Sequence, residues 1–177
     1  MTALVVGGAR SGKSALAESL CGRWGGPLLY IATLRPGGDA ENLRRIAAHR
    51  QRRAQLGFAT LERYDSLAQL RLPRRYGTVL LECLGNLAAN EIFEKGLAPA
   101  DFAGVALAGA VHMERQADNL VVVSNQIFSG AEDCGPGTRA YMDALAAANR
   151  ALAGRADVVA EAVCGIPVWH KGERWAT

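Results

Sequence analysis

The chain has 177 residues, of which half are apolar and 21 % are charged, and its formal net charge at neutral pH is +3. An apolar fraction of this size excludes a chain that is disordered throughout, because it is sufficient to form a hydrophobic core. The mild net charge does not indicate a nucleic-acid partner, since nucleic-acid-binding domains concentrate far more positive charge. The length predicts a single α/β domain over residues 1–177.

The cysteines and the apolar runs bear on the cellular compartment. The four cysteines form no C-x-x-C pair, so their spacing does not predict a zinc site. Cys83 and Cys164 lie in apolar segments, which favours buried, reduced thiols and a cytoplasmic protein. We expect no secretory signal, because the apolar run at 3–6 is short and leads directly into glycines. No apolar run approaches the length of a membrane span, so no span is expected.

The predicted elements alternate between strands and helices along the chain. A short apolar run predicts a buried strand over 2–6, and the alanine- and leucine-rich stretch beyond it predicts a helix over 13–23. There follow a strand over 28–32, a helix over 40–54, a weak strand over 58–62, a strand over 78–83, helices over 85–94 and 100–117, a strand over 120–124, a helix over 138–153 and a strand over 157–163. Continuous apolar strands separated by helices predict a mainly parallel sheet that is covered on both faces.

A phosphate-binding motif lies between the first predicted strand and the first predicted helix. It matches G-x-x-x-x-G-K-[ST] in full and consists of Gly7, Gly8, Ala9, Arg10, Ser11, Gly12, Lys13 and Ser14. The glycines let backbone N–H groups turn towards an anion, while the lysine reaches the β- and γ-phosphates and the serine hydroxyl binds Mg²⁺. Because a strand precedes the motif and a helix follows it, we predict a nucleoside triphosphate site rather than a chance glycine-rich turn.

A second acidic group often completes such a site by holding the metal from the end of a neighbouring strand. Glu82 follows the apolar run at 79–81 and is the candidate by position. The alternative is an ordinary polar residue at the end of a strand. We expect Glu82 and Ser14 to bind Mg²⁺ together.

The predicted helix over 40–54 has a basic face that contains a histidine. Asn42, Arg45, His49 and Arg52 are spaced three, four and three residues apart, so they share one side of a helix. Neighbouring positive charge favours the neutral imidazole, which can attack phosphorus, and arginines can hold phosphate groups. The more common explanation of such a pattern is a solvated basic helix face.

Taken in order, these segments resemble the bifunctional adenosylcobinamide kinase/adenosylcobinamide-phosphate guanylyltransferase family of cobalamin biosynthesis. The resemblance covers nearly the whole chain. It rests on the phosphate loop at 7–14, Tyr30-Ile31-Ala32-Thr33, R-I-x-x-H-x-x-x-R at 45–53, T-x-E at 60–62, Leu81-Glu82-Cys83-Leu84, Asn90, Val123-Ser124-Asn125, Arg139-x-Tyr141-x-Asp143, Asn149, Ala156-Asp157, Gly165-Ile166-Pro167 and Lys171.

The resemblance implies a P-loop NTPase-like α/β fold with RecA-like architecture that assembles into a homotrimer. It also implies two reactions. ATP or GTP phosphorylates the terminal hydroxyl of adenosylcobinamide, and GMP from GTP is then transferred to that phosphate through a guanylylated histidine, giving adenosyl-GDP-cobinamide.

The same resemblance assigns roles to individual residues. It implies that His49 is the nucleophile, that Lys13 and the loop amides bind the triphosphate, and that Ser14 and Glu82 bind Mg²⁺. The further residues that it places along the nucleotide site are Thr33, Arg50, Arg53 and Glu62.

The segment after Asn125 departs from the family pattern. Gln126 replaces the usual acid and Phe128 replaces a usual glycine, which affects the expected corrinoid specificity more than nucleotide binding. One alternative is therefore a kinase for adenosylcobinamide or another small alcohol without guanylyl transfer, in which His49 is structural. Another is a nucleotide-binding regulatory module with negligible chemistry.

Overall fold

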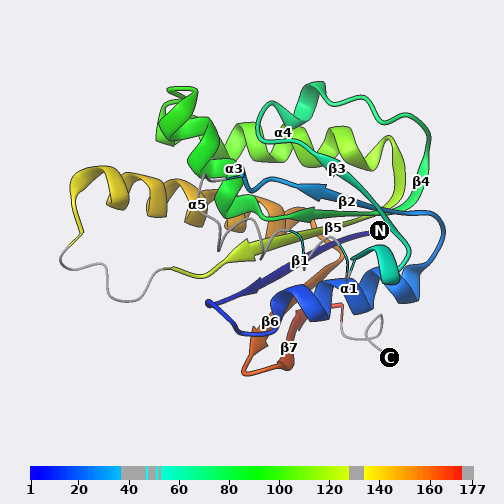
Figure 1. Cartoon of the computed structure of the whole chain (residues 1–177). Coiled ribbons are helices and arrows are strands. Elements are labelled where there is room, and N and C mark those ends of the chain that lie inside the picture. The colour runs from blue at the N-terminus through cyan, green and yellow to red at the C-terminus, as the bar shows by residue number, and fades with distance from the viewer. Residues whose placement is uncertain (37–46, 48–50, 52, 128–133, 173–177) are drawn as a thin grey trace.

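One seven-stranded sheet forms the centre of the computed structural model, which describes residues 1–36, 47, 51, 53–127 and 134–172 (Figure 1). The strands are β1 (Thr2–Gly7), β2 (Leu28–Ala32), β3 (Phe58–Glu62), β4 (Tyr76–Glu82), β5 (Ala117–Asn125), β6 (Val158–Val163) and β7 (Ile166–Lys171). Their order across the sheet is β3-β2-β4-β5-β1-β6-β7, and all neighbours are parallel except β6 and β7. The predicted mainly parallel sheet is confirmed.

Helices cover both faces of this sheet, as Figure 1 shows. The helices are α1 (Lys13–Trp24), α3 (Leu84–Ala89), α4 (Phe102–Glu114) and α5 (Pro136–Arg155), with a π-helical turn over Asn90–Glu94 and 3-10 turns over Leu67–Gln69 and Pro99–Asp101. Successive strand residues point to opposite faces, so Val5 packs in the core beneath α1 while Leu4 packs in the core beneath α3, α4 and α5. None of the described helices is long and apolar enough to cross a membrane.

Several predicted boundaries are wrong because sheet pairing overrides local sequence pattern. The helix predicted over 100–117 ends at Glu114, since Ala117 already pairs with Tyr76 in the ladder of β5 and β4. The same pairing starts β4 at Tyr76 rather than at 78. The unassigned end of the chain forms β7, which turns back on β6 as an antiparallel edge strand.

Two predicted segments fall largely outside the described residues. Of the helix predicted over 40–54, Ala47, Gln51 and residues 53–54 are described, and all of these are helical. The second is the divergent segment after Asn125, of which residues 126–127 and those from 134 onward are described, and α5 begins at Pro136 rather than at 138.

The carboxyl ends of the parallel strands bring Gly7, Glu62 and Glu82 of the predicted site to one edge of the sheet. Gly7 of β1 pairs with Asn125 of β5, and Glu82 of β4 pairs with Val123 of the same strand. β5 therefore lies between the strand that enters the phosphate loop and the strand that ends at Glu82. Ligands of open parallel sheets bind at this carboxyl edge.

Candidate active site

The phosphate loop connects β1 directly to α1. Gly12 precedes the helix with φ of 92°, a left-handed conformation that glycine adopts without steric cost. No side chain of the described residues caps the start of α1, so its first N–H groups and its positive end can face an anion. Ser11 Oγ is buried, and no hydrogen-bond partner for it occurs among the described residues. These features fit a loop that binds phosphate.

Lys13 bends back over the loop that it follows. Its Nζ donates a hydrogen bond to the carbonyl oxygen of Gly8 at 3.0 Å. This contact holds the ammonium group within the loop, where it can exchange one backbone carbonyl for phosphate oxygens.

Glu82 lies beside the phosphate loop, where its carboxylate meets Ser14. Side chains alternate along β4, so Glu82 projects to the same face as Leu80, which packs in the core beneath α1. Ser14 lies in the first turn of α1 and donates its hydroxyl to Glu82 Oε1. A carboxylate and a hydroxyl in contact form the oxygen donor set that Mg²⁺ takes up beside nucleotide phosphates. The residues present therefore fit the ion that the sequence predicts.

Tyr30 of β2 supplies the second contact of this carboxylate, since its hydroxyl donates to Glu82 Oε2 at 3.0 Å. Burial raises the pKa of the Tyr30 phenol above its ordinary value, and the Glu82 charge raises it further, so the hydroxyl keeps its proton. The guanidinium of Arg53 lies 3.8 Å from the centre of the Tyr30 ring, and Arg53 is only 4 % exposed. The structure thus brings Arg53 close to the side chain that binds Glu82.

Thr33 is fully buried immediately behind Glu82. Its hydroxyl donates to the carbonyl oxygen of Cys83 at 2.8 Å and accepts from the Cys83 N–H at 2.7 Å. Asn90 Nδ2 donates to the Thr33 carbonyl oxygen at 2.9 Å. Thr33 therefore supports the chain that leaves β4, and a direct contact with nucleotide stays a prediction.

Two cysteines that the sequence placed in apolar surroundings differ in the structure. Cys83 is buried, and burial raises the pKa of its thiol, so it is not a ready nucleophile. Cys164 is exposed in the turn between β6 and β7, so the prediction that it is buried is wrong. The apolar residues around it belong to β6 and β7, which pair at the edge of the sheet.

The remaining predicted site residues divide into two groups. Glu62 ends β3 at the same edge of the sheet and accepts a hydrogen bond from the Tyr64 hydroxyl. His49 and Arg50 lie outside the described residues, as do Asn42, Arg45 and Arg52.

The two described histidines make structural contacts, with His112 Nε2 2.9 Å from the Leu70 carbonyl oxygen and His170 Nε2 3.0 Å from Glu161 Oε2.

Sequence reasoning missed the contact between the phosphate loop and the turn that precedes β7. The Gly165 N–H donates to the Ser11 carbonyl oxygen at 2.9 Å. A Cβ on Gly12 would lie 3.0 Å from the Gly165 Cα, so the lack of a side chain at Gly12 allows the close approach of the two backbones. The Gly165-Ile166-Pro167 motif was the available signal, but nothing in its sequence placed it against residues 11 and 12.

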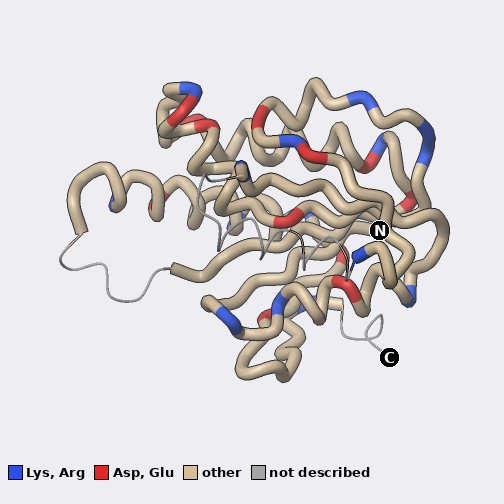
Figure 2. Tube along the Cα trace, in the orientation of Figure 1, with Lys and Arg blue, Asp and Glu red and all other residues tan. Residues whose placement is uncertain are grey.

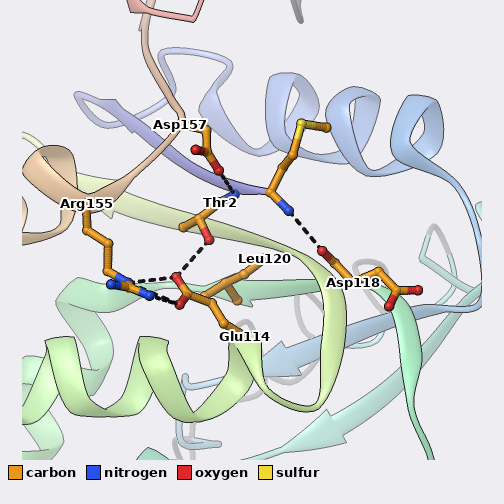
Figure 3. A pocket seen from close by; sticks show the side chains of 7 residues that line it. Thr2, Glu114, Asp118, Leu120, Arg155 and Asp157 are labelled. Atoms are coloured by element: carbon orange, nitrogen blue, oxygen red, sulfur yellow. Dashed lines mark hydrogen bonds and ion pairs between the residues drawn. The ribbon is translucent and has the colours of Figure 1, made fainter.

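A polar pocket of about 320 Å³ lies at the opposite edge of the sheet. Figure 3 shows how its side chains bind one another: Thr2 Oγ1 donates to Glu114 Oε1 at 2.8 Å, and Arg155 Nε donates to both Glu114 oxygens at 3.0 Å. Burial alone would raise the pKa of Glu114, but the hydrogen bonds from Arg155 and Thr2 outweigh it and lower that pKa. These bonds join the start of β1 to the ends of α4 and α5.

The parallel sheet and the loop–carboxylate contact define a P-loop nucleotide-binding protein of the α/β class. A family model described as cobinamide kinase/cobinamide phosphate guanyltransferase matches residues 3–169. The chain belongs to this family. Its members are bifunctional enzymes of adenosylcobalamin biosynthesis with cobinamide kinase and guanyltransferase activities.

Curated relatives extend the similarity over nearly the full chain. The bifunctional adenosylcobalamin biosynthesis protein CobP of Pseudomonas aeruginosa is 37 % identical over 175 residues, which cover 98 % of this chain and 99 % of that protein. The bifunctional adenosylcobalamin biosynthesis proteins CobU of Escherichia coli and Salmonella typhimurium are 34 % and 33 % identical over 181 residues, covering 95 % of this chain and 98 % of each protein.

Proposed function

We propose that this protein phosphorylates adenosylcobinamide with ATP or GTP and then transfers GMP from GTP to the product, giving adenosyl-GDP-cobinamide. The observation that carries the proposal is the hydrogen bond from Ser14 of the phosphate loop to Glu82 at the end of β4. It joins a triphosphate-binding loop to a carboxylate that can hold the metal. Family membership supports adenosylcobinamide as the acceptor and guanylyl transfer as the second reaction.

In the kinase step, the residues of this chain position the triphosphate and neutralise its charge. The loop N–H groups and the start of α1 hold the β- and γ-phosphates, and Lys13 exchanges the Gly8 carbonyl oxygen for phosphate oxygens. Ser14 and Glu82 hold Mg²⁺, which supplies charge neutralisation for the transferred phosphoryl group. The oxygen of the acceptor hydroxyl attacks the γ-phosphorus and loses its proton to solvent, while the bond from that phosphorus to the nucleoside diphosphate breaks.

In the guanylyl step, we assign the nucleophile to His49. Its neutral imidazole attacks the α-phosphorus of GTP, a nitrogen–phosphorus bond forms, and pyrophosphate leaves. A phosphate oxygen of adenosylcobinamide phosphate then attacks the same phosphorus and releases the imidazole. Arg53, which follows His49 by four residues in the sequence, lies over the Tyr30 ring beside Glu82, and this position supports the assignment. Arg50, Arg53, Glu62 and Thr33 are the further proposed nucleotide-site residues.

The histidine assignment is tested by covalent labelling. The protein is incubated with Mg²⁺ and GTP that is radiolabelled at the α-phosphorus, without corrinoid, and is then denatured. We expect label that is stable in alkali and lost in mild acid, as a phosphorus–nitrogen bond is. His49→Asn should abolish the label while conversion of adenosylcobinamide to its phosphate persists. Equal labelling of wild-type protein and His49→Asn would contradict the assignment.

We also propose that the protein is a cytoplasmic homotrimer that binds its corrinoid in a cleft between subunits. The family resemblance supports the trimer, and the free thiols of Cys21, Cys83 and Cys164 agree with a reducing compartment. Light scattering during gel filtration should give three times the chain mass of 18.8 kDa. The proposed cleft between subunits would be contradicted by a monomeric variant that keeps full turnover. The proposed location would be contradicted if cell fractionation recovers the native protein outside the cytoplasm.

A further inference from the structure

We propose that Tyr30 is a positioning residue for Glu82. The phenol of Tyr30 holds the Glu82 carboxylate against Ser14 and so preforms the metal site. The inference rests on the proposed function, because it takes Glu82 as the metal ligand.

The two oxygens of Glu82 have different partners, which together fix the orientation of the carboxylate. Oε1 accepts from the Ser14 hydroxyl, and Oε2 accepts from the Tyr30 hydroxyl at 3.0 Å. A glutamate at a strand end has several torsions to order, and each ordered torsion costs conformational entropy. Because Tyr30 holds Oε2, the torsions of the Glu82 side chain are already ordered in the folded protein before the metal binds.

Tyr30 can hold Glu82 because the ring itself is held on three sides. The tyrosine is 7 % exposed, and the sheet register pairs it with Leu80, two residues before Glu82 on the same face. The Phe58 ring meets it edge to face, with centroids 6.3 Å apart, and the Arg53 guanidinium covers it at 3.8 Å. The hydroxyl therefore has a defined position at the carboxyl edge.

The contacts of Tyr30 also connect residues assigned to the two reactions. Its hydroxyl binds Glu82, a proposed metal ligand, and its ring binds Arg53, which follows His49 by four residues. Tyr30→Phe separates these contacts, because phenylalanine keeps the ring that packs against Phe58 and Arg53 and removes only the bond to Glu82.

The test measures metal binding directly. Free Mn²⁺ is followed by its EPR signal during titration of the protein with a non-hydrolysable GTP analogue bound, without acceptor. Tyr30→Phe should raise the apparent Kd for Mn²⁺ about tenfold, as loss of a hydrogen-bond partner of a metal ligand commonly does. Analogue binding in EDTA should stay within about twofold, because the lost hydrogen bond joins Tyr30 to Glu82 and neither side chain is proposed to contact the phosphates without metal. In turnover, the half-saturating Mg²⁺ concentration should rise while kcat at saturating Mg²⁺ recovers.

Two further variants separate the possible outcomes. Tyr76→Phe removes a phenol from the other end of β4, where Tyr76 is 5 % exposed, and should leave Mn²⁺ binding unchanged. Glu82→Gln should weaken Mn²⁺ binding at least as much as Tyr30→Phe. Unchanged Mn²⁺ binding in Tyr30→Phe with a loss in Glu82→Gln overturns the role of Tyr30 alone. No loss in Glu82→Gln overturns the metal assignment as well. If Tyr76→Phe weakens Mn²⁺ binding as much as Tyr30→Phe does, the positioning role of Tyr30 is overturned. It is also overturned if Tyr30→Phe weakens analogue binding in EDTA to the same extent, because Tyr30 then acts only on the structure.

Discussion

At the scale of single residues, Lys13 holds its ammonium 3.0 Å from the Gly8 carbonyl oxygen, inside the loop that would receive the triphosphate. The contact is local, so the side chain adds little to the fold and is available to the ligand. Lys13 should therefore contribute much to catalysis and little to stability.

Lys13→Ala should reduce kcat/KM for both the kinase and guanylyl reactions by about 10²- to 10³-fold, since it removes a positioned charge from the phosphates. The melting temperature should change little, because only the bond to Gly8 is lost. Steady-state rates and a thermal melt check both parts. Lys95→Ala, which removes an exposed ion pair to Asp65 at 3.8 Å, is the matched control and should keep wild-type rates. Retained activity in Lys13→Ala would contradict the phosphate-loop assignment.

Thr33→Val should lower the free energy of unfolding by about 1–3 kcal/mol, because the N–H and carbonyl groups of buried Cys83 lose their hydroxyl partner. Thr33→Ser keeps the hydroxyl, so its free energy of unfolding should fall less than that of Thr33→Val. Urea denaturation of the three proteins measures the difference. Equal stability of Thr33→Val and wild type would show that this hydroxyl does not support the end of β4.

The sequence predicts some of these residues better than others for a physical reason. Lys13 and Ser14 belong to one continuous motif whose spacing fixes their placement, and Glu82 follows from a strand that ends in an acid. Tyr30 could not be predicted as a partner of Glu82, because that contact depends on the register of β2 against β4 and on the packing of Arg53. Roles that depend on two distant segments are not encoded in the spacing of either one.

At the scale of elements, the turn between β6 and β7 closes over the phosphate loop. Gly165 adopts φ of 84° and donates its N–H to the Ser11 carbonyl oxygen. A Cβ at Gly165 would meet no atom within 4 Å, so a side chain there is opposed by backbone conformation rather than by lack of space. The hairpin thus supports the loop through its backbone.

Gly165→Ala should lower the free energy of unfolding by about 1–2 kcal/mol, the cost of a left-handed conformation for a residue with a Cβ. Nucleotide affinity should fall with it, because the turn that holds Ser11 is displaced. Gly104→Ala, in the exposed interior of α4, is the matched control and should be neutral or stabilising by about 0.5–1 kcal/mol. Chemical denaturation and calorimetric titration with nucleotide check both effects. Unchanged stability and affinity in Gly165→Ala would contradict the support role.

Element prediction succeeded where the local pattern and the tertiary structure agree. β1, β2 and the start of α1 have apolar or helical patterns that the sheet and its covering helix retain. β7 was missed because Pro167 and the exposed Ile166 and Val168 do not have the pattern of a buried strand. An edge strand is defined by its pairing with β6, and pairing between segments is not visible in either sequence.

At the scale of the whole molecule, acidic and basic residues are interspersed along the described chain (Figure 2). One group of them joins three elements at the edge opposite the phosphate loop, where Glu114 binds Arg155 and Thr2. Since these bonds lower the Glu114 pKa in the folded state, they stabilise the fold only while the carboxylate is charged. The contribution is present above the ordinary Glu pKa of 4.5 and is lost as pH falls through the lower folded pKa.

Glu114→Gln should therefore be less stable than wild type at pH 7, and the difference in unfolding free energy should shrink as the pH falls below 4.5. Glutamine still accepts from Thr2 but lacks the charge that binds Arg155. Denaturant unfolding at a series of pH values measures this difference, and Asp118→Asn is the control at the exposed rim, where Arg75 Nε donates to Asp118 Oδ1 at 2.8 Å. A difference that is constant over pH would contradict the assigned role of the Glu114 charge.

The central claim is that one phosphate-loop protein both phosphorylates a corrinoid and transfers GMP to it. Mass spectrometry of the corrinoid after incubation with adenosylcobinamide, GTP and Mg²⁺ tests this most directly. We expect a GDP-linked corrinoid, with adenosylcobinamide phosphate as an earlier product. A reaction that stops at the phosphate would contradict the guanylyl half and leave a kinase, and nucleotide binding without any corrinoid product would contradict both.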